Sequence, residues 1–225
     1  MSARAIDLLG AGSGIAFVAL ELIGFGLGGS LHQLTVTSST ADVASAIATT
    51  ASTASWISAY LSVLGYGAFL AFAVWASTRV GGGSLARAAA TSYATLCIAS
   101  LAVVDALAYR AGNGLTVPMA RTLSAVNEAL FVTTWFVMAF FLLATGVAAL
   151  REARRLVGST AVAAGLFTLL ATAVSINSVG QLSTLVFFVW VIGASIGLGL
   201  RHSRPARRSQ VTPALADGRL RGGEA

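Results

Sequence analysis

Apolar residues along the chain form six long runs separated by short polar connections. The runs cover residues 9–29, 56–78, 88–109, 129–150, 157–176 and 182–200. A helix needs about 20 consecutive apolar residues to cross the roughly 30 Å hydrocarbon core of a membrane. Each run is long enough to cross the membrane once. The pattern therefore predicts an all-α, polytopic membrane protein, with six transmembrane helices in one bundle over residues 1–200.

Composition agrees with this fold class. The chain has 225 residues, of which 56% are apolar and 10% are charged, and its mean hydropathy is +0.84. A soluble domain of this size carries about a quarter charged residues, so most soluble folds are excluded. The single cysteine, Cys97, excludes an internal disulfide framework and a cysteine metal cluster, and it is expected to be a packed core residue. Gly24, Gly26 and Gly29 match the nucleotide-binding pattern G-x-G-x-x-G, but no strand precedes them and the segment is a predicted spanning helix, so the match is interpreted as a false positive. No Walker, metal-binding or nucleophile motif occurs, so neither a cofactor nor a metal is predicted.

Arginine is distributed unevenly between the two sides of the predicted bundle. All 14 basic residues are Arg, and twelve of them lie before the first run, in the second and fourth connections, or in residues 201–225. Positive residues are retained on the cytoplasmic side of a membrane. Both termini are therefore expected in the cytoplasm. The absence of Lys, together with abundant Ala, Gly and Arg, favours a bacterial source and hence the plasma membrane.

The last residues, 201–225, are expected to form a basic, disordered cytoplasmic tail, because they lack periodic apolar residues. Their segment RHSRPARR is either a contact for anionic lipid or an ordinary topology anchor. Most of the net charge of +6 comes from this tail. No basic face interleaved with aromatic residues occurs, so a nucleic-acid partner is not expected.

The connection over residues 30–55 is rich in Ser, Thr and Ala. Ser39 followed by Asp42 matches the spacing of a capping box, in which each side chain bonds the backbone N–H of the other residue. This spacing predicts a short surface helix that begins after Ser39. The alternative is a polar linker without secondary structure.

Three acidic residues lie within or at the edge of the apolar runs: Glu21, Asp105 and Glu128. A charge near the centre of a membrane costs about 2.5 to 3.5 kcal/mol on insertion scales, so such residues are functional candidates. In a helix, Glu21 shares one face with a stripe of glycines at positions 10, 14, 24 and 28. Small residues allow helices to approach closely in lipid. The stripe is therefore expected to turn Glu21 into the bundle.

The other two acids have their own expected neighbours. Tyr109, one turn after Asp105, is expected to donate a hydrogen bond to its carboxyl, and Arg110 is expected to neutralise it. Glu128 is expected to open the fourth membrane helix, where an acid interacts favourably with the helix dipole.

Depth connects the three acids. A rise of 1.5 Å per residue places Glu21 about 3 Å, Asp105 about 10 Å and Glu128 about 15 Å outward of the membrane midplane. With His32, Tyr109, Arg110 and Arg121 at similar or greater height, they are expected to line an outward-facing polar cavity with Glu21 as its floor. In the alternative, Arg110 and Arg121 pair with Asp105 and Glu128, while a protonated Glu21 bonds a neighbouring helix.

Three stretches of sequence carry a resemblance to known proteins. They are LLGAGSGIAFVALELIGFGLGG in the first run, AYLSVLGYGAFLAFAVW in the second and FFVWVIGASIGLGLR in the last. Through them the chain resembles a group of small six-helix bacterial membrane proteins of unknown function. The resemblance implies a six-helix plasma-membrane fold. It implies no activity, cofactor or site.

Three functional hypotheses follow. In the first, a non-enzymatic membrane protein binds or moves a small solute, cation or proton with Glu21, Asp105 and their neighbours. In the second, a structural or regulatory subunit packs against a copy of itself or another membrane protein through small-residue motifs such as Gly10-x-x-x-Gly14 and Gly193-x-x-x-Gly197. In the third, a membrane-embedded enzyme uses Glu21 as an acid on a lipid or isoprenoid.

Overall fold

The computed structural model describes residues 2–27, 34, 38–49, 53–111, 113–174 and 180–200 of the chain. Its helices are α1 (Ala3–Leu27), α2 (Thr40–Thr49), α3 (Thr53–Arg79), α4 (Ser84–Ala111), α5 (Val117–Arg151), α6 (Arg155–Val174) and α7 (Gly180–Leu200). Within this described part, six helices are long and apolar enough to span a membrane, and α2 is the short exception. The prediction of six spanning helices is confirmed. The orientation of the termini stays a prediction, and the tail lies outside the described residues.

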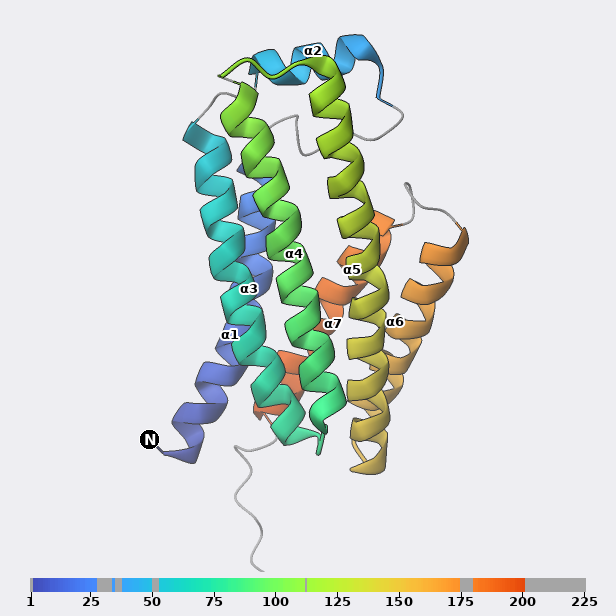
Figure 1. Ribbon diagram of the computed structural model, residues 1–225. Helices are drawn as coiled ribbons and strands as arrows, with labels where there is room; N and C mark the ends of the chain where they lie inside the picture. The colour runs from blue at the N-terminus through green and yellow to red at the C-terminus, as the bar shows by residue number, and fades with distance from the viewer. Residues whose placement is uncertain are drawn as a thin grey trace, which may run out of the picture.

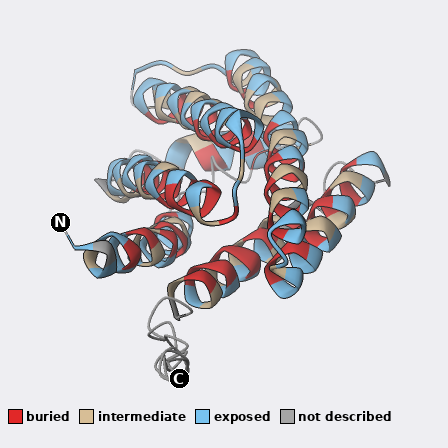
Figure 2. Ribbon diagram, turned by 90° about the horizontal axis from the view of Figure 1, so that it is seen from below, coloured by how far each residue is buried: buried red, intermediate tan, exposed pale blue. Residues whose placement is uncertain are grey.

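The six long helices form a ring, which Figure 2 shows end-on. Helices that follow one another in the sequence pack together, from α3 on α4 through to α6 on α7, and α1 packs on α3. The ring closes where α7 packs on α1, and α7 also contacts α3 and α5. The first and last spans therefore contribute to the same interior.

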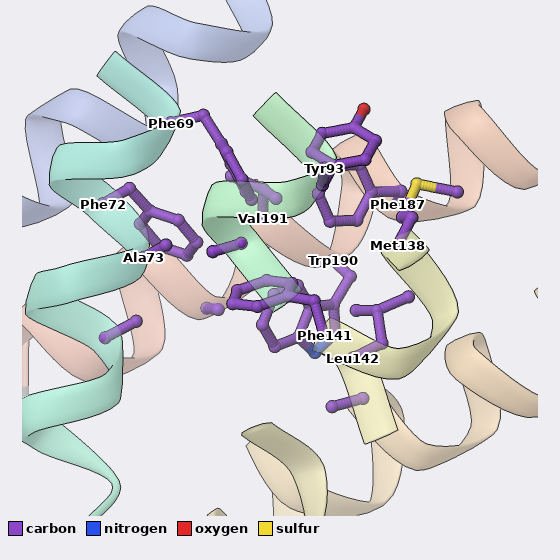
Figure 3. Packing of buried hydrophobic residues seen from close by; sticks show 14 of the residues in the cluster. Phe69, Phe72, Ala73, Tyr93, Met138, Phe141, Leu142, Phe187, Trp190 and Val191 are labelled. Atoms are coloured by element: carbon purple, nitrogen blue, oxygen red, sulfur yellow. The ribbon is translucent and has the colours of Figure 1, made fainter. Parts of the chain in front are cut away.

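Aromatic side chains fill the interior of the ring (Figure 3). Phe69 of α3 is fully buried, and its ring lies 5.1 Å from that of Phe17 on α1 and 5.7 Å from that of Phe187 on α7. It also meets Tyr93 of α4 at 5.2 Å and Phe141 of α5 at 5.4 Å, both edge-on. Edge-on aromatic pairs add about 0.5 to 1.5 kcal/mol beyond the area that they bury. Five of the spanning helices thus converge on one side chain.

The outer faces of the helices are apolar as well. Leu8 on α1, Leu156 on α6 and Val189 on α7 are each about 70% exposed, and many other large apolar side chains also point outward. A soluble protein does not expose so much contiguous apolar surface. The exposed apolar surface is therefore what a lipid-facing bundle requires.

Helix α2 lies across one end of the bundle (Figure 1), which we call the α2 end. Ser39 and Asp42 form the expected capping box: Asp42 N–H donates to Ser39 Oγ at 3.1 Å, and Ser39 N–H donates to Asp42 Oδ2 at 3.2 Å. The Ser39 hydroxyl also donates to Asp42 Oδ2, and these bonds hold the pKa of the Asp42 carboxyl below its usual value. The surface helix is confirmed and the unstructured alternative is wrong.

Helix α5 begins much earlier than the run from residue 129 predicted. Its N-cap is Thr116, whose Oγ1 accepts a hydrogen bond from Met119 N–H, and Pro118 lies in the first turn. The expectation that Glu128 opens a helix is therefore wrong, because this residue lies well inside α5. The apolar run from residue 129 indicates only the later, more apolar part of α5. The helix begins several turns earlier, and these more polar first turns lie beneath α2.

Candidate functional site

The small-residue stripe of α1 faces α3, as the sequence predicted. A Cβ at Gly10 would overlap the Trp75 ring, one at Gly14 would overlap Phe72 and Ser195, and one at Gly24 would lie 2.9 Å from Ser62 Oγ. In addition, Ser58 of α3 donates a hydrogen bond of 2.6 Å to the Gly24 carbonyl. The motif starting at Gly10 is thus used inside the bundle and is not left for a partner. Gly28 lies outside the described residues.

Glu21 is carried by this close contact into the α1–α3 interface. Its Oε1 is buried and accepts no hydrogen bond, although the carboxyl lies beside the hydroxyls of Tyr66 and Ser62. Gly65 makes room for the carboxyl, since a Cβ there would lie 2.6 Å from Oε1. A buried acceptor without a hydrogen bond costs about 1 to 3 kcal/mol. Glu21 therefore holds an acceptor atom that a bound proton or cation would satisfy.

The polar contacts of Glu21 continue across the bundle. The Tyr66 side chain lies beside both the Glu21 carboxyl and Cys97 of α4. The side chains of Tyr93 and Thr134 also lie near Cys97, and the Thr134 hydroxyl donates a 2.6 Å hydrogen bond to the Phe131 carbonyl. Because a hydroxyl has a single proton, Tyr66 can donate to only one of its two neighbours at a time. We call Glu21, Ser62, Tyr66, Tyr93, Cys97 and Thr134 the Glu21 cluster.

Sequence reasoning found Glu21 but missed most of this cluster. Tyr66 and Tyr93 are 8% and 5% exposed, and each comes from the middle of a spanning helix. A tyrosine hydroxyl in hydrocarbon needs a partner, so a mid-span tyrosine was a usable signal. Cys97 was expected to be a packed residue and is buried as expected.

Asp105 and its expected partners lie apart from Glu21. Asp105 is half-buried on α4, and none of the interactions described for Glu21 involves it. Tyr109 is 60% exposed and Arg110 is exposed. Within the described part of the chain, neither residue donates a hydrogen bond to Asp105 or forms an ion pair with it. The structure thus does not join Asp105 and Glu21 into one site.

Arg121 and Glu128 occupy the polar first part of α5. Arg121 donates to the Ser38 carbonyl at 3.4 Å and to Thr40 Oγ1 at 3.0 Å, so it fastens the start of α2 to the bundle. Glu128 is half-buried and takes part in other contacts. His32, which was expected near the mouth of a cavity, lies outside the described residues.

A second buried carboxyl, which the sequence did not single out, lies at the other end of α1. Asp7 forms an ion pair with Arg79 at the end of α3, and its Oδ1 accepts a 3.1 Å hydrogen bond from Trp75 Nε1. Asp7 precedes the first apolar run, so it was not counted among the membrane acids. The pair fastens α1 to α3 far from Glu21.

A groove of about 350 Å³ lies on α4 and is lined by Thr91, Ser92, Thr95 and Leu96. It opens on the exposed face of the helix, and neither Glu21 nor Asp105 lines it. This groove is therefore not the polar cavity expected above Glu21. Among the described residues, no group of three or more His, Cys, Asp or Glu side chains is placed to hold a metal ion.

Comparison with known proteins identifies no relative of this chain. No family model, curated protein or solved structure matches the chain. Function must therefore be argued from the chemistry of the site alone.

Proposed function

We propose that this membrane protein binds a proton or small cation at Glu21 in the course of moving it, or a solute coupled to it, across the bilayer. The observation that carries the proposal is the buried Oε1 of Glu21, an acceptor without a hydrogen bond inside a spanning helix. A carboxyl inside the membrane is costly and marks ion pathways and proton relays. Ser62 and Tyr66 are able to donate to the ionised carboxyl and to accept from the protonated one. The site thus has partners for both states.

Replacing Glu21 with Gln is expected to abolish proton movement. The amide keeps the shape of the carboxyl but neither takes up nor releases a proton near neutral pH. The measurement uses liposomes that contain the purified protein and an entrapped pH-sensitive dye, with a membrane potential imposed by a potassium gradient. The wild type should acidify the lumen, and E21Q should behave as protein-free liposomes do. Exchanging sodium for choline in the buffer distinguishes a cation from a proton.

Two glycine variants on α3 form a matched control for the position of the carboxyl. In Gly65→Ala the new methyl group displaces Glu21 Oε1, whereas a Cβ at Gly67 meets no atom within 4 Å. The side chain of Glu21 is flexible at its end, so G65A should fold but lose flux, while G67A should keep it. Asp105→Asn should also keep it, because Asp105 lies outside the Glu21 cluster. Equal flux in E21Q and the wild type would contradict the proposal.

The exposed face of α4 favours a second candidate, a subunit of a larger membrane assembly. This helix has the lowest hydropathy of the six spans, and its groove carries the hydroxyls of Thr91, Ser92 and Thr95. All three residues are exposed in the single chain. Contact with a second copy would remove these hydroxyls from lipid.

Thr95→Trp is expected to split such an assembly, because the indole would fill the groove. Native mass spectrometry in a mild detergent should then show the wild type as an oligomer and T95W as the 22.8 kDa monomer. Val189→Trp, on a surface 71% exposed on α7, provides the control and should leave the oligomer intact. A monomeric wild type with no copurifying protein would rule this candidate out.

A further inference from the structure

A row of buried and half-buried polar side chains leads from the Glu21 cluster toward the α2 end along the interface of α4 and α5. Ser100 of α4 donates a hydrogen bond of 2.5 Å to Asn127 Oδ1 of α5. One turn of α5 nearer the α2 end, Ser124 is 3% exposed, and its Oγ has no hydrogen-bond partner. We call Ser100, Asn127 and Ser124 the α4–α5 seam. The Ser100–Asn127 hydrogen bond joins the two helices, whereas the Ser124 hydroxyl is left without a partner.

The α4–α5 seam meets the Glu21 cluster at Cys97. Ser100 lies one helical turn from Cys97 on α4, and both residues are buried. Cys97 in turn contacts Thr134 of α5 and Tyr66 of α3, and Tyr66 contacts Glu21. Polar side chains on four helices thus lie between Ser124 and Glu21, and among them Ser100 and Asn127 share a hydrogen bond.

The outer end of the seam lies under α2. Val43 and Ala46 of α2 pack on Leu107 and Ala108 of α4 and on Ala120, one turn of α5 from Ser124. This apolar cluster separates the seam from the surface at the α2 end. A path along the seam from the α2 end would thus pass this apolar cluster.

We propose that the α4–α5 seam is the route by which protons and water pass between the α2 end and Glu21. This inference rests on the proposed function of Glu21 and assigns it an access path. The Ser124 hydroxyl and the Asn127 amide present donors and an acceptor to a water molecule, which needs two to four polar partners in a protein interior. Hydroxyls relay protons because each accepts one proton as it releases another. A proton that enters at Ser124 ends on the Glu21 carboxylate, so charge and atoms balance.

The route is tested by proton flux in liposomes with seam variants that leave Glu21 intact. Asn127→Leu, and separately the double variant Ser100→Ala with Ser124→Ala, should slow luminal acidification about tenfold, because apolar side chains do not relay protons or hold water. Thr145→Val is the matched control, since Thr145 is a fully buried α5 residue whose Oγ1 also lacks a partner. Its flux should equal that of the wild type.

The outcomes separate the route from the function. If E21Q abolishes flux while both seam variants keep the wild-type rate, the route is wrong and the proposed function stands. If E21Q keeps the wild-type rate, the proposed function fails and the route with it.

A second measurement needs no flux and keeps the test valid where a variant folds poorly. Cys97 is the only cysteine of the chain, and silver ion, which travels in water, reacts with thiolates. Silver added to the wild type in membranes should modify Cys97, and Asn127→Leu should slow that reaction. A wild-type Cys97 that silver never reaches would overturn the route.

Discussion

Arg79→Met should destabilise the protein by about 3 to 5 kcal/mol, because it leaves the buried carboxylate of Asp7 without a counter-charge. Asp7 is 6% exposed, and its Oδ2 is buried without a hydrogen bond. The Trp75 indole then remains as the described donor to the carboxylate. One neutral donor does not replace a guanidinium, so α1 should separate from α3 at this end. Unfolding in a titration of mild detergent with SDS would measure the loss.

Two further variants identify the cause of that loss. Arg87→Met removes an exposed arginine at the start of α4 and should change stability by no more than about 0.5 kcal/mol. Adding Asp7→Asn to R79M removes the uncompensated charge and should recover part of the lost stability. If R79M is as stable as the wild type, the ion pair does not hold α1 to α3.

Phe69→Ala should cost about 3 to 5 kcal/mol, the range for removing a buried phenylalanine side chain. Lipid weakens the hydrophobic part of this cost, but the lost packing contacts and the cavity remain. Phe69 is fully buried and meets the rings of Tyr93, Phe141 and Phe187 on α4, α5 and α7 (Figure 3). It also meets a ring of α1. The cavity would therefore loosen several helix contacts at once. The same SDS titration measures the change.

Phe140→Ala is the matched control for this prediction. Phe140 is 56% exposed on the lipid-facing side of α5. Its removal exchanges one apolar contact with lipid for another, so the change should stay within about 0.5 kcal/mol. Equal losses in F69A and F140A would show that the aromatic cluster is not the centre of the bundle. Phe69→Leu should lie between the two, because it leaves a smaller cavity.

The aromatic residues show how far hydropathy carries a prediction for a membrane bundle. The hydropathy pattern does not distinguish a lipid-facing aromatic residue of the fourth or sixth span from a packed one. In the structure they divide: Phe141 and Phe187 are fully buried, whereas Phe140 faces outward. An aromatic ring is stable both in lipid and in the bundle interior. The spacing of aromatic residues along a helix therefore does not indicate which face points inward. On α1 the glycine stripe did indicate the inward face, which carries Glu21, because two helices approach closely only where small residues lie between them.

The sequence by itself determined six spanning helices, the capping box of α2 and the inward turn of Glu21. Each of these depends on residues within one segment: the length of an apolar run, the Ser39 to Asp42 spacing, and the glycines of α1. The tertiary structure decided which helices meet, and with that the neighbours of Glu21, the pairing of Asp7 with Arg79, and the α4–α5 seam. These contacts join residues far apart in the chain. In a membrane, the lipid-facing and the inward-facing sides of a helix are both apolar. The hydropathy pattern therefore does not show which residues of different helices are in contact.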